Sequence, residues 1–161
     1  QIANLNKETP DLGTTCVVAF LKNNFLYVAN VGDSRAYLIL KNEMQQITKD
    51  HSVINELLMQ GKITSDEAEN SNNKNIITRA LGCSNSTPDY YEINIKSDNK
   101  VLICTDGLTN CLHKNEIYEI INKNSPEQAI KILINNANKN GGIDNITVAL
   151  IFWFNFIYFF N

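Results

Sequence analysis

Four short segments with strand patterns follow one another near the start of the chain. They cover residues 14–22, 25–32, 34–41 and 43–48, so the gaps between them have only the length of a turn. Asn23-Asn24 fills the first gap, and such a pair favours a hairpin turn. Because parallel strands need a long crossover, strands spaced this closely predict an antiparallel meander.

Helical patterns replace the strand patterns after Lys49. Residues 53, 54, 57 and 58 are apolar at helical spacing, and Gly61 ends this run. Thr64 is followed three residues later by Glu67, which predicts a second, short helix with a capping box. A polar loop is expected over residues 70–75.

Strands and helices alternate in the remaining chain. Residues 90–95 and 100–105 have strand patterns, and the turn-forming residues 97–99 between them predict a hairpin. Two helices are expected next, over about 114–122 and from the N-cap Ser125 with Pro126 at its first position. A last strand is expected at 145–152. Strands, then helices, then a returning strand predict an α+β layered fold.

Charge and cysteine usage exclude several classes of protein. The net charge of -3 and the scattered Lys and Arg residues argue against a nucleic-acid-binding surface. The four cysteines form no CxxC pair, so neither a zinc site nor a disulfide scaffold is indicated. The length of 161 residues suits one domain, and a reducing, cytoplasmic location is expected.

The two ends of the chain differ from the rest in composition. The chain begins at Gln1 rather than Met, and we interpret residues 1–12 as the remnant of an upstream segment. The tail at 152–161 holds half of the 14 aromatic residues. It is too short to span a bilayer, so no membrane span is expected. We interpret it as an over-long last strand or the translated product of a disrupted gene, and a partner-binding edge is a third reading.

Three aspartates lie beside turns at the ends of predicted strands. Asp33 follows one strand, Asp106 follows another, and Asp144 precedes the last. Turns at strand ends converge in a layered sheet, and clustered carboxylates repel one another unless a cation joins them. Oxygen ligands of this kind suit Mg²⁺ or Mn²⁺. The alternative is ordinary turn chemistry, in which each aspartate only shapes its own turn.

Six motifs in order carry a family resemblance. They are GTT (13–15), VANVGDSRAYL (28–38), ITKDHS (47–52), ITRALG (77–82), VLICTDGLTN (101–110) and GGIDNITV (141–148). Together they resemble the bacterial, metal-dependent serine/threonine protein phosphatases of type 2C. The resemblance covers residues 13–151. It implies an antiparallel β-sandwich flanked by helix pairs, in α-β-β-α layers.

The resemblance also implies a site and an activity. Asp106 and Asp144 would bind catalytic Mn²⁺ or Mg²⁺, and Asp33 would help Asp106 to hold a third, weaker ion. Gly107, Asn145 and Gly32 would support the turns, with Gly107 aiming the Asp106 carboxylate. Residues 52–75 match the flap beside the family's active site. The implied activity is hydrolysis of phosphoserine and phosphothreonine in proteins phosphorylated by a cognate kinase.

The family's first motifs do not occur in the chain. They comprise an acidic residue on the first strand, an Arg that grips phosphate, and a D-G-x-G-G-H stretch with a metal-bridging Asp and a general-acid His. We therefore expect a domain incomplete at its N-terminus, no catalytic residue beyond the metal ligands, and little or no activity. Two alternatives remain: a non-catalytic module that binds phosphoproteins, and a phosphatase-like regulator of an anti-sigma-factor antagonist.

Overall fold

The computed structural model describes residues 12–69, 71, 76–152 and 156–160. Its strands are β1 (Cys16–Lys22), β2 (Phe25–Val31), β3 (Arg35–Ile39), β4 (Met44–Gln46), β5 (Asp89–Asn94), β6 (Lys100–Cys104), β7 (Val148–Phe152) and β8 (Phe156–Phe160). Its helices are α2 (Val53–Met59), α3 (Ser65–Glu69), α4 (Asp106–Thr109), α5 (Lys114–Lys123) and α6 (Pro126–Lys139). The expected helix starts are present, and Thr64 and Glu67 exchange the two hydrogen bonds of a capping box.

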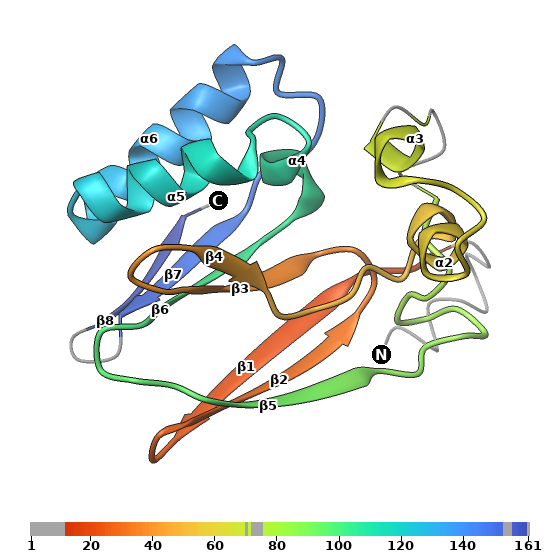
Figure 1. The fold of residues 1–161 in the computed structure, drawn as a ribbon, viewed down its shortest axis with the longest axis horizontal. Helices are drawn as coiled ribbons and strands as arrows, with labels where there is room; N and C mark the ends of the chain where they lie inside the picture. The colour runs from red at the N-terminus through yellow and green to blue at the C-terminus, as the bar shows by residue number, and fades with distance from the viewer. Residues whose placement is uncertain (1–11, 70, 72–75, 153–155, 161) are drawn as a thin grey trace.

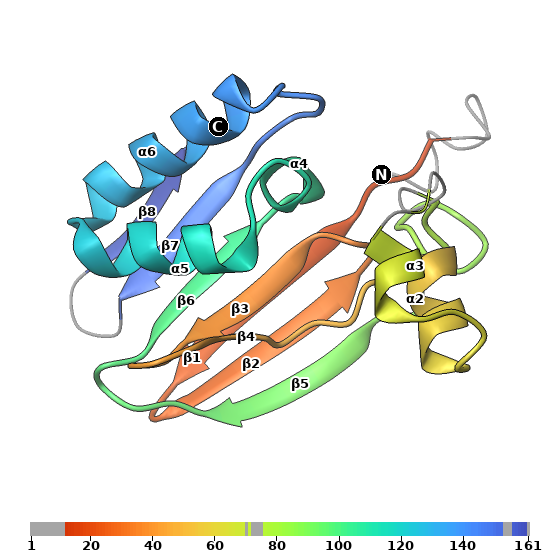
Figure 2. The same cartoon turned by 45° about the horizontal axis from the view of Figure 1, so that its top comes forward.

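The strands form two antiparallel sheets that pack face to face (Figures 1 and 2). One sheet has the order β1-β2-β5, and the other has the order β4-β3-β6-β7-β8. The residues between the sheets include Leu26, Val28, Leu38 and Val101, and their burial provides much of the apolar contact that holds the sandwich together. The predicted antiparallel sandwich is therefore confirmed.

Two predicted strand pairings are wrong. The first four strands do not form a single meander, because the chain leaves the first sheet after Val31 and β3 begins the second sheet. β5 and β6 do not form a hairpin either, because β5 pairs with β2 and β6 pairs with β3 and β7. Alternating apolar residues mark which face of a strand is buried, but they carry no information about its neighbour.

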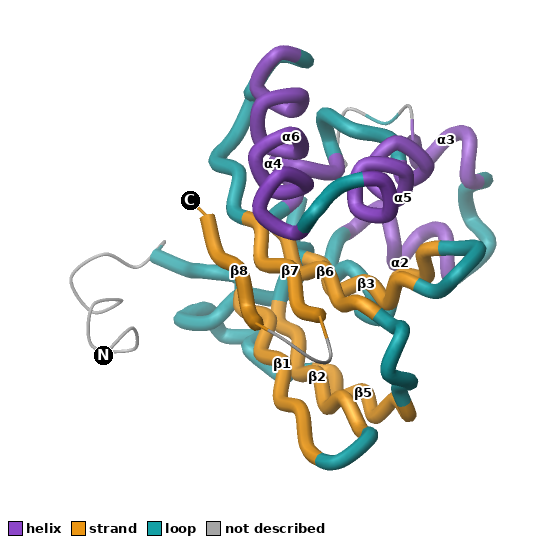
Figure 3. The backbone as a smooth tube through the Cα atoms, turned by 90° about the vertical axis from the view of Figure 1, so that its left-hand side faces the viewer, coloured by secondary structure: helices purple, strands orange, loops and turns teal. Residues whose placement is uncertain are grey.

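Helices α4, α5 and α6 cover the outer face of the five-stranded sheet, which gives the layers seen in Figure 3. Ile117 and Ile121 of α5 and Ile130 and Leu133 of α6 are fully buried against that sheet. The four apolar side chains recur at helical spacing, as the sequence predicts. Helix α4 was not predicted, because four residues are too few for a periodic pattern.

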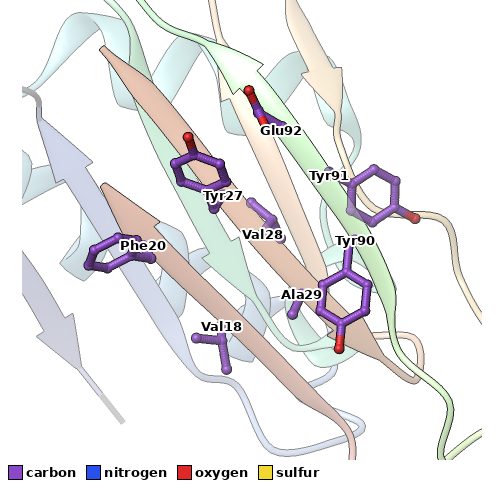
Figure 4. A pocket seen from close by; sticks show the side chains of 8 residues that line it. All are labelled: Val18, Phe20, Tyr27, Val28, Ala29, Tyr90, Tyr91 and Glu92. Atoms are coloured by element: carbon purple, nitrogen blue, oxygen red, sulfur yellow. The ribbon is translucent and has the colours of Figure 1, made fainter. Parts of the chain in front are cut away.

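The outer face of the β1-β2-β5 sheet is covered by no described helix (Figure 3), and mostly apolar side chains lie on it (Figure 4). Its side chains include Phe20, Tyr27 and Tyr90, which are 58%, 37% and 77% exposed. They surround a shallow depression of about 340 Å³. The resemblance implies one helix pair on each sheet. The described residues contain the pair on the five-stranded sheet, α5 and α6.

The aromatic tail contains a strand of its own. β8 pairs with β7 as an edge strand, with Phe152 opposite Phe156, so the tail is a hairpin arm rather than a simple extension of β7. Residues 153–155 and the N-terminal segment 1–11 lie outside the described residues. In the described part of the chain, no helix has the length and hydropathy needed to cross a bilayer.

Candidate metal centre

Three adjacent strand ends bring the predicted metal ligands to one rim of the five-stranded sheet. Asp33 lies in the turn before β3, Asp106 is the first residue of α4 directly after β6, and Asp144 lies in the loop before β7. In the sheet β6 is the neighbour of both β3 and β7, and Cys104 of β6 pairs with Arg35 and Val148. Asp106 therefore lies between the other two carboxylates in strand order.

The carboxylates affect one another's ionisation. Burial, followed by the negative charge of Asp106, raises the pKa of Asp33 to about 6. Burial and then the charge of Asp144 raise the pKa of Asp106. Each shift reflects the cost of a carboxylate anion that is partly removed from water beside another anion. A bound divalent cation would remove that cost.

The donor set fits a hydrated Mg²⁺ or Mn²⁺. These ions prefer oxygen ligands, keep several waters and need only one or two carboxylates each from a protein. Asp33 with Asp106, and Asp106 with Asp144, supply two such pairs. Within the described residues, no three His, Cys, Asp or Glu side chains gather closely enough to form a complete protein cage. The arrangement therefore suits ions that draw further ligands from water or a phosphate.

The loop that contains Asp144 is held against the start of α4. The Thr105 hydroxyl donates a hydrogen bond of 2.9 Å to the carbonyl oxygen of Asn145 and accepts one of 3.0 Å from the Thr147 amide. The Asn145 amide donates to Asp144 Oδ1 at 2.7 Å. A Cβ atom added at Gly107 would lie 2.5 Å from the Asn145 carbonyl oxygen. The loop and the helix can approach this closely because residue 107 has no side chain.

The expected role of Gly107 as a turn residue is wrong. It lies inside α4, and its φ is not in the left-handed region that Gly32 occupies. Gly107 is needed for space, whereas Gly32 is needed for backbone conformation, with a φ of +105°. A Cβ atom at Gly32 would also collide with the side chain of Thr15. Asn145, the third support expected, contributes mainly through its backbone.

Sequence reasoning missed the hydrogen-bond partner of Asp106. Asn110 Nδ2 donates to Asp106 Oδ2 at 3.1 Å from the next turn of the chain. This bond holds one carboxylate oxygen in place and favours the ionised form. The signal was the spacing of four residues between Asp106 and Asn110, which places both side chains on one side of a helical turn.

An ion pair links the same rim to the flap, and sequence reasoning missed it as well. Arg35 Nε lies 3.0 and 2.9 Å from the two oxygens of Asp50, and a second guanidinium nitrogen lies 2.5 Å from Asp50 Oδ2. Gln46 Nε2 donates to Asp50 Oδ1 at 2.9 Å. Asp50 lies two residues before the flap, so this pair joins the strand that follows Asp33 to the segment that leads into the flap.

A cleft of about 830 Å³ lies between the rim and the flap. Its walls include Asp33 and Asp106 on the rim side, Ile54 and Leu58 of α2 on the flap side, and the start of α5. His113, the residue before α5, is exposed at the cleft. The cleft is large enough for a phosphorylated side chain with part of its peptide.

Thiol chemistry at the rim is disfavoured. Burial raises the pKa of the Cys104 thiol to about 12, so the sulfur stays protonated and non-nucleophilic near neutral pH. The four cysteines, all within the described residues, are free.

Comparison with known proteins identifies the family. A family profile for Protein phosphatase 2C matches residues 1–57. The serine/threonine phosphatase stp of Listeria welshimeri is 40% identical over 142 residues, which are 87% of this chain and 56% of that protein. The crystal structure of the PPM Ser-Thr phosphatase MsPP from Mycobacterium smegmatis, in complex with cacodylate, matches with a TM-score of 0.84 at 34% identity, over 93% of this chain and 67% of that one. This chain belongs to the protein phosphatase 2C family.

A further solved structure that matches this chain contains manganese ions. The catalytic domain of the serine/threonine protein phosphatase PstP, solved in complex with two manganese ions, matches with a TM-score of 0.81 at 32% identity. That match covers 92% of this chain and 63% of the PstP chain. This chain spans a little over half the length, 56%, of its curated Listeria relative. The α+β sandwich and the family predicted from the six motifs are both confirmed.

Proposed function

We propose that this protein is a Mn²⁺- or Mg²⁺-dependent phosphatase that hydrolyses phosphoserine and phosphothreonine in proteins. The observation that supports this most directly is the rim of Asp33, Asp106 and Asp144, where the charge of one carboxylate raises the pKa of the next. A rim of mutually repelling oxygen donors beside a large cleft is expected of a metal-assisted hydrolase. Its substrates would be proteins phosphorylated by a cognate serine/threonine kinase in the cytoplasm.

Each residue of the rim has a proposed role. Asp106 and Asp144 would hold one ion, and Asp33 with Asp106 would hold another. Such ions supply charge stabilisation at phosphoryl oxygens and an activated water. Asn110 keeps the Asp106 carboxylate oriented. Arg35 neutralises Asp50, so that Asp50 adds less negative charge to a cleft that must admit a phosphate.

The test of this proposal is metal-dependent hydrolysis of p-nitrophenyl phosphate and a phosphothreonine peptide. The chain by itself is expected to turn over slowly, because the family's metal-bridging Asp and phosphate-gripping Arg do not occur in its sequence. A chimera in which residues 13–151 replace the matching part of the Listeria welshimeri phosphatase supplies the remaining length. We expect Mn²⁺-dependent turnover from the chimera, at least about 100-fold above the same chimera with Asp106→Asn. A folded chimera without turnover would contradict the proposal.

A second candidate is a non-catalytic module that binds phosphoproteins through the same cleft. The family motifs that do not occur in the sequence favour it for the chain alone. The two candidates differ in one measurement. A module would bind a phosphothreonine peptide without releasing phosphate even in the chimera, whereas an enzyme would release it.

A further inference from the structure

His51 is buried where the flap joins the metal rim. Its side chain is 4% exposed, so it touches neither solvent nor a substrate in the cleft. Its backbone amide donates to the Gly32 carbonyl oxygen at 3.0 Å, and its carbonyl oxygen accepts from the Thr78 amide at 2.8 Å. His51 thus lies between the turn that carries Asp33 and the residues at which the flap returns.

The imidazole of His51 makes a second bond to the same turn. The Gly32 amide donates to His51 Nδ1 at 3.1 Å, so Nδ1 carries no proton and the neutral ring has its proton on Nε2. Nε2 lies 3.2 Å from Asp89 Oδ2, although it forms no aligned hydrogen bond with any described residue. Both the amide and the carbonyl of Gly32 are therefore held by one residue.

The turn at Gly32 needs such support. Gly32 has a φ of +105°, and the next residue, Asp33, presents a partly buried carboxylate beside the charge of Asp106. Repulsion between the two carboxylates favours movement of Asp33 away from the rim. A second buried side chain, Asn30, donates to the Gly32 carbonyl oxygen at 3.2 Å, but only His51 holds the amide.

His51 also contacts residues beside the flap. Ser52, the first residue of the flap, forms a β-bridge with Ile77. Arg79, shortly after the flap, forms an ion pair of 2.8 Å with Asp89. Asp89 is also the residue that faces His51 Nε2. A chain of contacts therefore connects the Asp33 turn, through His51, to the residues at both ends of the flap. A change at His51 is transmitted to the turn directly, by loss of the Gly32 bond.

We propose that His51 is a positioning residue, which holds the Gly32–Asp33 turn through Nδ1 so that Asp33 and Asp106 can share a divalent cation. This inference rests on the proposed function for the identity of the cation. It assigns His51 no contact with substrate, since its side chain is buried. Its effect on metal binding is exerted through the backbone of Gly32.

Two substitutions distinguish the roles of the two ring nitrogens of His51. His51→Asn keeps an acceptor near the position of Nδ1 but loses the group that faces Asp89. His51→Gln keeps a polar group near the position of Nε2 but loses the acceptor for Gly32. Mn²⁺ binding to the chain is measured from the electron paramagnetic resonance signal of free Mn²⁺. We expect the Kd to rise about 10-fold in His51→Gln and no more than about 3-fold in His51→Asn.

A double variant tests whether the effect passes through Asp33. In an Asp33→Asn background the positioned carboxylate is gone, so His51→Gln should weaken Mn²⁺ binding no further. An unchanged Kd in His51→Gln, or an equal further loss in the Asp33→Asn background, would overturn the inference. Circular dichroism and the Tm of each variant confirm that it is folded.

Failure of the proposed function gives a different pattern. If the chain binds no Mn²⁺, or binds it equally well with Asp33→Asn, the metal assignment fails, and so does the part of the inference that concerns the cation. The positioning of the turn is then decided by nuclear magnetic resonance. We expect a protected Gly32 amide that exchanges at least about 10-fold faster in His51→Gln, and a proton on His51 Nε2 in the unmodified chain. A proton on Nδ1 would overturn the inference without the use of any variant.

Discussion

Gly107 and Asn145 approach so closely that any other residue at position 107 would have to displace the backbone of Asn145. A Cβ atom there would lie 2.5 Å from the Asn145 carbonyl oxygen and 3.3 Å from that of Asp144. Both neighbours are backbone atoms, so they cannot rotate away as a side chain would. The spacing between the helix that starts with Asp106 and the loop that holds Asp144 is therefore set by a glycine.

Substitution of Gly107 should separate these two carboxylates. We expect Gly107→Ala to lower the free energy of unfolding by about 1–3 kcal/mol and to weaken Mn²⁺ binding. Gly61→Asn is the control, because a Cβ atom at Gly61 would meet nothing within 4 Å and asparagine tolerates its φ of +67°. Urea unfolding and Mn²⁺ titration of both variants check this. Equal stability and affinity in Gly107→Ala would show that the loop can move without consequence.

The metal-free chain should lose stability as pH rises through the pKa of Asp33. Burial and then the charge of Asp106 raise this pKa from 3.8 to about 6 in the folded chain. The folded state therefore binds the proton more tightly than the unfolded state. The resulting stabilisation is complete below pH 3.8 and is lost as pH rises through about 6.

Asp33→Asn isolates this contribution. With a chelator present, the variant should be more stable than the unmodified chain at about pH 8, by about 1 kcal/mol because solvent screens the partly exposed carboxylate. The difference should vanish near pH 4. Urea unfolding at several pH values measures it, with the exposed Asp98→Asn as control. A difference independent of pH would mean that ionisation of Asp33 is not its cause.

The sequence predicts the faces of strands better than their partners. In β5, Tyr91 and Ile93 point to the core while Tyr90 and Glu92 point outward, as the alternation indicates. The same alternation is compatible with pairing to β2 or to β6, and the nearer strand in sequence was the wrong choice. Pairing depends on the turn at Gly32, where the chain passes from one sheet to the other.

The proposed metal ligands were chosen from their own turns, but the long-range contacts that hold those turns were not predicted. Asp33 and Asp106 each follow a strand, which is a local feature that a sequence displays. The contacts Arg35–Asp50 and Gly32–His51 join residues 15 and 19 positions apart. Such contacts exist only once the sheets have formed, and no local pattern marks them. Asn110 is the exception, since its spacing from Asp106 is local.

The apolar outer face of the β1-β2-β5 sheet should bind hydrophobic dyes. Phe20 and Tyr90 are more than half exposed on this face (Figure 4). We expect the Phe20→Thr, Tyr90→Thr double variant to reduce fluorescence of bound anilinonaphthalene sulfonate severalfold and to change stability by no more than about 1 kcal/mol. Glu92→Thr on the same face is the control. Undiminished dye binding would locate the accessible apolar surface elsewhere.

The Arg35–Asp50 pair should contribute far more to stability than an exposed pair. Arg35 uses two nitrogens on a carboxylate whose side chain is only 13% exposed, whereas Glu119 and Lys123 form a single contact at 52% and 72% exposure. In double-mutant cycles to alanine we expect a coupling energy of about 2 kcal/mol for the first pair and below about 0.5 kcal/mol for the second. Urea unfolding of the unmodified chain and the six variants provides both values. Similar couplings would mean that solvent screens Arg35 and Asp50 as well, and the pair could not then anchor the flap to the rim.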